Sequence, residues 1–443
     1  MNDLAILFLA VNSVALLLLP RRLAPLPLLI GTCYMTIGQG IRIGPFLFTV
    51  LRFLLLVAFV RMLLRRERPA GGMVSLDWVM LVNATWSIAC SMFHEPPAGA
   101  LVYRLGVVYN WLGVYVFVRS LCQTKAEIIQ LLKCVAALLI PVAVEMTFEQ
   151  LTGGNLFAVF GRVHDEVVVR AGRFRAQGPF AHAILAGTVG ATCLPFMAAL
   201  RRYHPRYARA GALACLVMVV TSASSGPILA MLAGLFGLLM WRYRFEMRKF
   251  QIRAVLLYMT LAVVMKRPVY FLIASIDLTG SSTGWHRAQL IRSSIQHIDE
   301  WWFAGTDYTR HWMSTGVSSV DMPNMTDITS QYIGNGVNGG LLQMSLFMLA
   351  LWVGFLYVGR IIQYPASALD TQKLAWTLGV NLFVHAVSCL SVSYFDQSQV
   401  FLYLSTAVVA SLYAIERSAQ PSPAELFPAE TAEPPPALAG AGA

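Results

Sequence analysis

Apolar segments of helix length recur along the whole chain, and they restrict its fold more than any other feature. Hydropathy windows identify thirteen candidate membrane spans, and a count of twelve fits nearly as well. Hydrophobic residues make up 57% of the 443 residues and charged residues only 12%, whereas a soluble protein is about a quarter charged. A soluble enzyme, a disordered chain and a disulfide scaffold are therefore excluded. The predicted fold class is all-α, a polytopic transmembrane helical bundle. Its predicted spans are 3–19, 23–41, 45–64, 74–93, 101–119, 128–148, 181–200, 207–222, 226–242, 253–273, 331–359, 373–393 and 396–416.

The basic residues predict how these spans are oriented. About 21 of the 33 Lys and Arg residues lie in alternate connections or just after the last span, and such loops normally face the cytoplasm. The net charge of +11 is then mostly a topology signal, and no nucleic-acid partner is expected. The chain is predicted to divide into six parts: N-terminal spans in 1–150, a periplasmic loop 151–180, central spans in 181–273, a large periplasmic loop 274–330, C-terminal spans in 331–416 and a disordered cytoplasmic tail 417–443.

Motifs for metal and nucleotide chemistry are missing from the sequence. The seven cysteines occur singly, without a CxxC or Cys/His spacing. There is also no GxGxxG, Walker or HExxH pattern. The sequence therefore predicts neither a metal nor a cofactor.

The large loop 274–330 concentrates side chains suited to carbohydrate. It holds four of the ten tryptophans, whose rings can stack on the apolar faces of sugars, together with imidazoles that can bond hydroxyls. The alternative is an aromatic belt at the membrane interface. The candidate sugar-binding residues of this loop are Trp285, His286, His311 and Trp312.

One stretch of this loop, 287–302, is predicted to be an amphipathic helix. At about 100° per residue, an apolar face collects Leu290, Ile291, Ser294, Ile295, Ile298, Trp301 and Trp302. Arg287 falls in the middle of that face, whereas Arg292 falls on the polar face and is expected to be solvated. Arg287 is either a site residue directed inward or a helix-start arginine whose charge reaches water.

The loop 151–180 carries arginines on the side of the membrane where positive charge is disfavoured. Arg170, Arg173 and Arg175 lie there, just before a span. Arginine binds phosphate oxygens in pairs and stays charged, so the cluster suits a diphosphate at the membrane surface. Lipid headgroup binding is the alternative. Lys266 and Arg267 either add to the positive electrostatic field of these arginines or anchor the end of a helix.

Several short motifs resemble those of the O-antigen ligase/polymerase superfamily. Arg175-Ala-Gln-Gly-Pro-Phe-Ala-His182 is similar to an arginine followed by a Gly/Pro turn that opens a membrane helix. Thr221-Ser-Ala-Ser-Ser-Gly-Pro227 resembles the family's Ser-Arg-Gly turn, with Ser225 where arginine is usual. The large loop with Arg287 near its start also fits, as does Asp327-Ile-Thr-Ser-Gln-Tyr-Ile333 where the loop re-enters the membrane. The resemblance covers roughly residues 140–360.

The resemblance implies a fold, a reaction and a set of partners. It implies a C-type glycosyltransferase-like architecture in the bacterial inner membrane, acting at the periplasmic face without metal. The expected partners are an undecaprenyl-diphosphate-linked glycan donor, a glycan or lipid-linked glycan acceptor and the lipid bilayer, with co-polymerase or export proteins as further candidates. Arg175 and Arg287 would hold the diphosphate and neutralise charge on the leaving group.

The sequence departs from the family at the residue that activates the acceptor. Ligases carry a histidine in the re-entry segment, whereas residues 326–332 here contain none. Asp327 could take the proton instead, as could His286 or His311 if they fold back. The missing histidine favours a polymerase of lipid-linked repeat units over a ligase that transfers glycan to lipid A core. A non-enzymatic glycan carrier is the competing class of protein.

Overall fold

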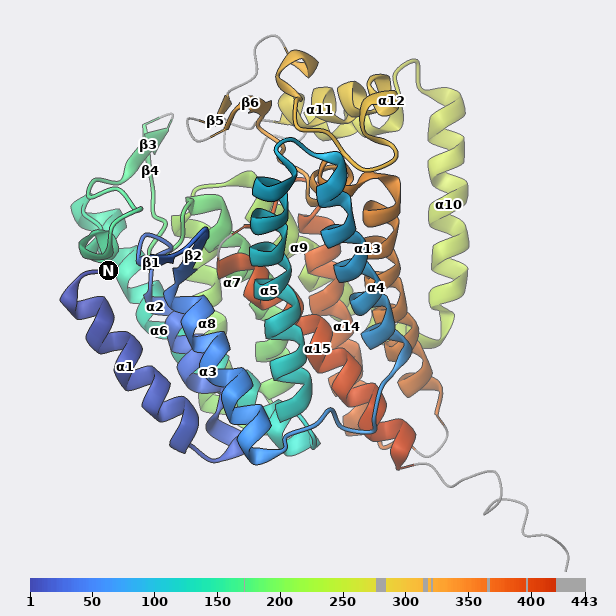
Figure 1. Ribbon diagram of the computed structural model, residues 1–443. Helices are drawn as coiled ribbons and strands as arrows, with labels where there is room; N and C mark the ends of the chain where they lie inside the picture. Colours follow the sequence, from blue (N-terminus) through green and yellow to red (C-terminus); the bar gives the residue numbers. More distant parts are fainter. Residues whose placement is uncertain are drawn as a thin grey trace, which may run out of the picture.

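The computed structural model describes residues 1–170, 172–275, 284–313, 318–319, 322–364, 367–395 and 397–419. It is 75% helix and 5% strand, which confirms the prediction of an all-α bundle (Figure 1). The predicted tail lies outside these residues from position 420 onward.

Most helices run along the length of the bundle, and short hairpins connect some of them. The long helices are α1 (Asp3–Leu18), α2 (Pro25–Tyr34), α3 (Val50–Arg65), α4 (Ser75–Ala89), α5 (Pro97–Leu121), α6 (Lys125–Thr152), α7 (Ala183–Leu200), α8 (Pro205–Thr221), α9 (Ser225–Leu239), α10 (Met247–Val264), α13 (Gln331–Gln363), α14 (Leu369–Ser388) and α15 (Gln397–Ser418). The antiparallel hairpins pair β1 (Gly40–Ile43) with β2 (Phe46–Thr49), β3 (Val168–Arg170) with β4 (Arg173–Arg175), and β5 (Ser318–Ser319) with β6 (Met322–Thr326).

Seven segments among the described residues are long and apolar enough to cross a membrane. They are Ser75–Phe93, Pro97–Leu121, Lys125–Thr152, Ala183–Leu200, Ser225–Val264, Gln331–Gln363 and Gln397–Ser418. A helix needs about 20 residues to span the hydrocarbon core. The chain is therefore a multi-pass membrane protein by length and composition, and the count of twelve or thirteen spans stays a prediction. Several predicted spans are shorter as helices: α2 covers ten residues, 46–49 forms a strand, and α10 ends at Val264 although its span was predicted to reach 273.

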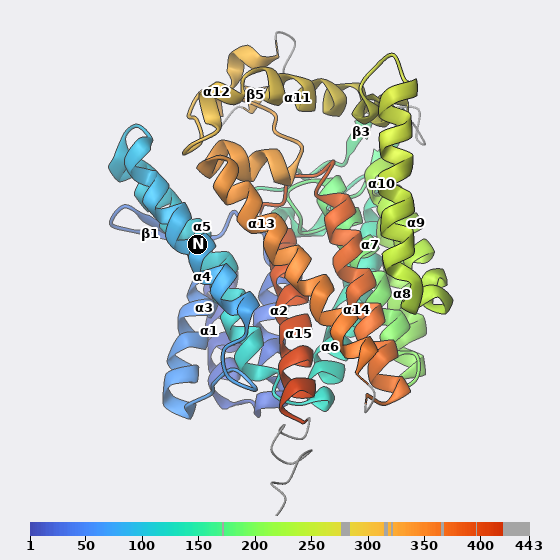
Figure 2. The ribbon, with the colours of Figure 1, turned by 90° about the vertical axis from the view of Figure 1, so that its right-hand side faces the viewer.

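The centre of the bundle is formed by α7 and α15, the most buried of these segments. α7 packs against α8, α9 and α14, while α15 packs against α5, α13 and α14 (Figure 2). Gly187 and Gly190 allow this close packing in α7, because a Cβ on Gly190 would lie 2.8 Å from the Cys215 carbonyl oxygen. By contrast, no residue of α10 is buried, and it stands at the edge of the bundle (Figure 1).

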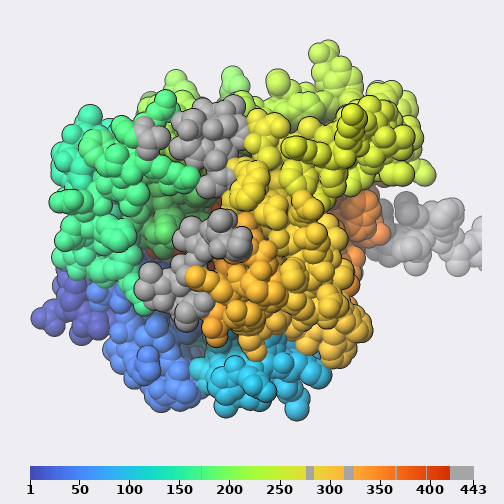
Figure 3. Space-filling model, turned by 90° about the horizontal axis from the view of Figure 1, so that it is seen from above, coloured from blue at the N-terminus to red at the C-terminus, as the bar shows by residue number. Residues whose placement is uncertain are grey.

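The two long connections lie at the same end of the bundle, as their shared orientation predicts. The β3–β4 hairpin and the helices α11 (Gly284–Gln296) and α12 (Ile298–Trp301) cover this end, which we call the loop-bearing end (Figures 1 and 2). Seen from above, segment 151–170 and α11 face each other across a hollow in the surface (Figure 3).

The predicted amphipathic helix 287–302 forms as two helices with a break at His297. The His297 backbone is not helical, with φ −106° and ψ 28°, so the helical faces do not continue through it. Leu290 and Trp301 of the predicted apolar face are buried, but Ile298 and Trp302 are exposed. The prediction of one continuous helix was therefore wrong, because the chain turns at His297 and packs Trp301 on α13.

Backbone contacts fasten this loop to a break in α13. The break lies at Gly339 and Gly340, which have non-helical backbone angles. There the Leu341 N–H donates to the Trp302 carbonyl at 2.8 Å, and the Thr306 N–H donates to the Val337 carbonyl at 2.9 Å. The helical segment before the break and the loop that precedes it are consequently held as one unit.

Candidate functional site

Arg175 reaches the site from the last residue of β4. The β3–β4 register pairs Arg175 with Val168, and the neighbouring Ala176 N–H donates to the Thr221 carbonyl at 3.0 Å. The half-buried Arg175 then donates from Nη2 to the Ser224 hydroxyl oxygen at 2.7 Å. Its Nε is buried without a hydrogen-bond partner among the described residues.

Arg287 approaches the same turn from the opposite side. It lies in the first turn of α11, is only 8% exposed, and donates from Nε to the Ser391 carbonyl at 3.1 Å. A Cβ placed on Gly226 would lie 3.9 Å from Arg287 Nη2. Arg287 is therefore directed into the protein, which confirms the inward placement, whereas Arg292 is exposed as predicted.

The two arginines thus meet at residues 224–226, where α9 begins. A helix N-terminus carries a partial positive charge and presents backbone N–H groups. The N-cap residue Ser224 makes no side-chain capping bond to the helix. In the part of the chain that the structure describes, neither guanidinium forms an ion pair with a carboxylate. One buried and one half-buried guanidinium beside a helix N-terminus form a strong site for an anion.

The electrostatics of the site agree with this geometry. Burial lowers the pKa of Arg175 below its usual value, and the positive charge of Arg170 lowers it further. Burial lowers the pKa of Arg287 as well, with Arg170 adding to the shift and Asp327 opposing it. Arg170 therefore lies within electrostatic range of both guanidinium groups. An anion placed among the three would relieve their repulsion.

Asp327 and two histidines complete this region. Asp327 is exposed and follows β6, and its carbonyl lies 3.2 Å from Nε2 of His286. His182, the residue before α7, interacts electrostatically with both Asp327 and Arg175. Its ring meets Phe395 edge-on at 5.8 Å. Sequence reasoning missed His182 as a candidate, although it ends the motif that begins at Arg175.

Glu149 shapes the turn that follows Arg175. Its carboxylate is fully buried and accepts hydrogen bonds from the Gln177 N–H at 2.8 Å and the Gly178 N–H at 2.7 Å. It also accepts from Asn155 Nδ2 at 2.9 Å. Both ends of the 151–180 connection are thereby tied to the end of α6. This buried carboxylate positions the arginine without contacting it.

The other predicted site residues lie outside this group. Trp312 is 4% exposed and packs inside the loop with Leu290 and Trp301, so it offers no face to a sugar. His311 hydrogen-bonds Glu300 instead of Asp327. The remaining predicted residues, Arg173, Lys266, Arg267 and Trp285, are exposed at the surface.

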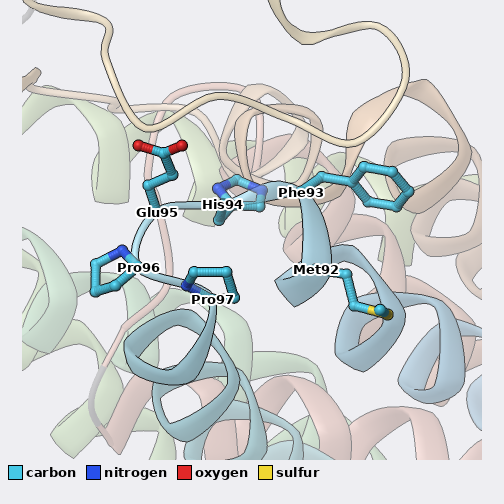
Figure 4. A pocket seen from close by; sticks show the side chains of 6 residues that line it. All are labelled: Met92, Phe93, His94, Glu95, Pro96 and Pro97. Atoms are coloured by element: carbon cyan, nitrogen blue, oxygen red, sulfur yellow. The ribbon is translucent and has the colours of Figure 1, made fainter.

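A separate pocket lies at the turn between α4 and α5. It is lined by Met92, Phe93, His94, Glu95, Pro96 and Pro97 (Figure 4). His94 Nδ1 lies 2.5 Å from Asp307 Oδ1, and Arg104 Nη2 lies 2.6 Å from His94 Nε2. These contacts fasten the turn to the residues that follow α12, and none of the lining residues belongs to the arginine site.

Comparison with known proteins adds no further assignment. The chain matches no family model and no curated protein. The functional conclusion therefore rests on the chemistry of the arginine site in a multi-pass membrane protein.

Proposed function

We propose that the chain is an inner-membrane glycosyltransferase that polymerises undecaprenyl-diphosphate-linked oligosaccharide repeat units at the periplasmic face. The main support for this proposal is that Arg175 and Arg287 converge on the N-terminus of α9 at the loop-bearing end. In the proposed orientation this end of the bundle lies just outside the hydrocarbon core, where a lipid-linked diphosphate presents its charge.

The two arginines act on the leaving group. When the glycosidic bond breaks, negative charge develops on the diphosphate oxygens. Donors held in place before the reaction stabilise that charge, and removing one costs about 10²–10³ in rate. Arg170 adds positive charge to the same region.

The acceptor hydroxyl must lose a proton as it attacks the sugar. Asp327 remains the proposed base, and the structure adds His182 as a second candidate because it interacts with Asp327 and Arg175. In this scheme one of them accepts the proton and the other holds the acceptor. The exposure of Asp327 leaves room for a second lipid-linked glycan.

Purified full-length protein in lipid nanodiscs, supplied with a synthetic lipid-linked repeat unit, tests the proposal. Arg175→Lys and Arg287→Lys each retain positive charge but lose paired hydrogen bonding. We expect each to slow elongation by about 10²-fold. Arg292→Lys, an exposed change on the same helix as Arg287, should elongate like the wild type.

The products separate the alternatives. Elongated lipid-linked glycan supports the polymerase, whereas transfer only to added lipid A core would identify a ligase. Transport in sealed vesicles without a new glycosidic bond would identify a carrier. Normal elongation by both arginine variants would overturn the assigned site.

A further inference from the structure

We propose that His297, Glu300 and His311 bind one divalent transition-metal ion, for which Zn²⁺ is the best fit. One ligand atom from each residue lies within 4.8 Å of the others. His297 Nδ1 lies 2.7 Å and His311 Nε2 lies 2.9 Å from the same carboxylate oxygen, Glu300 Oε1. The three side chains therefore already converge on one point.

The chemistry of this ligand set matches borderline metal ions. Zn²⁺ binds imidazole nitrogen and carboxylate oxygen at about 2.0–2.2 Å, so its ligand atoms must lie within roughly 4 Å of one another. Small side-chain movements meet that requirement. Two histidines and one carboxylate leave a position for water, and hard ions such as Mg²⁺ prefer oxygen ligands alone.

Neighbouring aromatic residues hold the three ligands in position. The Trp312 indole N–H donates to Glu300 Oε2 at 2.9 Å, which leaves Oε1 turned toward the histidines. The His297 ring stacks on Trp312 with a 9° angle between planes, and the His311 ring stacks on Tyr308 at 12°. Such outer contacts orient metal ligands, and losing one typically weakens affinity 10- to 100-fold.

The position of the site indicates what the ion would do. It joins the start of α12 to the short helix η6 (Arg310–Trp312) across the outer loop. Thr309, just before η6, makes two hydrogen bonds with β6. Its N–H donates to the Asn324 carbonyl at 3.1 Å, and its hydroxyl oxygen accepts from the Thr326 N–H at 3.0 Å. Bound metal would therefore also steady the segment that carries Asp327. The proposal does not depend on the proposed glycosyltransferase activity.

Metal binding by the purified full-length protein tests this site. After treatment with a chelator and its removal, the protein is dialysed against Zn²⁺, and Co²⁺ is added separately to read the ligand field. We expect one ion per chain. His297→Ala and His311→Ala should abolish this stoichiometric binding, and Trp312→Phe, which removes the indole N–H donor and reduces the ring that stacks on His297, should weaken it at least about tenfold.

Two controls keep the result interpretable. His164→Ala removes an exposed histidine from the other loop and should bind like the wild type. Glu300→Gln keeps the size of the side chain, and it serves as the test variant if an alanine variant fails to fold. The proposal is overturned if the wild type shows no saturable binding, or if one ion per chain still binds in folded variants of both histidines.

Discussion

At the scale of single residues, Glu149 determines where Arg175 can lie. Its buried carboxylate accepts two backbone N–H groups of the turn after β4. Glu149→Gln places an amide NH₂ where an acceptor is needed, and a buried unsatisfied donor costs about 1–3 kcal/mol. We expect a lower melting temperature and slower elongation, measured on the same preparation. Glu166→Gln, an exposed change in the same loop, should alter neither quantity.

The second residue-scale prediction concerns the pH dependence conferred by His182. Desolvation lowers the pKa of His182 below its ordinary value of 6.5, Asp327 opposes the shift, and Arg175 and His164 add to it. The imidazole is then neutral at about pH 7 and gains its proton only at lower pH. If His182 is the base, elongation stays level above the ordinary histidine pKa of 6.5 and declines only at pH values below it.

His182→Gln separates the two candidate bases. The variant should be slower and should lose the decline at low pH when His182 accepts the proton. An unchanged profile, together with inactivity of Asp327→Asn, would assign the role to Asp327.

At the scale of elements, the break in α13 is the feature that joins the outer loop to the bundle. Gly340 has φ +74° and ψ −175°, a conformation that residues with a Cβ avoid at a cost on the order of 1–3 kcal/mol. A Cβ there would also collide with the Phe303 carbonyl oxygen. Gly340→Ala should therefore lower the melting temperature.

A second glycine of the same helix provides the control. A Cβ on Gly359 meets no neighbouring atom, so Gly359→Ala should leave stability unchanged or raise it slightly. Equal melting temperatures for the two variants would contradict the role given to the break.

At the scale of the whole molecule, both long connections lie at the same end of the bundle, which predicts that they face the same side of the membrane. Single cysteines at Arg173 and Asp299, which are exposed in β4 and α12, should react with an impermeant maleimide in intact spheroplasts. Arg206→Cys, exposed in the first turn of α8 at the opposite end of the bundle, should react only after permeabilisation. The seven native cysteines are all buried, so their background labelling should be low. Labelling of Arg173→Cys and Asp299→Cys under different conditions would contradict this topology.

Much of the architecture is readable from the chain because membrane helices obey simple rules. Apolar length predicts the spans and the positive charges predict their orientation, since both depend on local composition alone. The apolar face of a short helix left two placements open for Arg287, inward or reaching water at the helix start, and its burial in the structure decides for the inward one. The break at His297 escaped this reasoning, since the packing of Trp301 against α13 outweighs helical periodicity.

The sequence by itself determined a helical membrane protein, and it predicted two arginine-bearing loops at the same end. Only the tertiary structure decided which side chains meet. Arg175 and Arg287 come together because Ser224 and Gly226 begin α9 between them, and His182 joins them from the start of α7. The same holds for His297, Glu300 and His311, whose spacing matches no metal motif. Contacts between distant segments depend on packing, which local patterns do not encode.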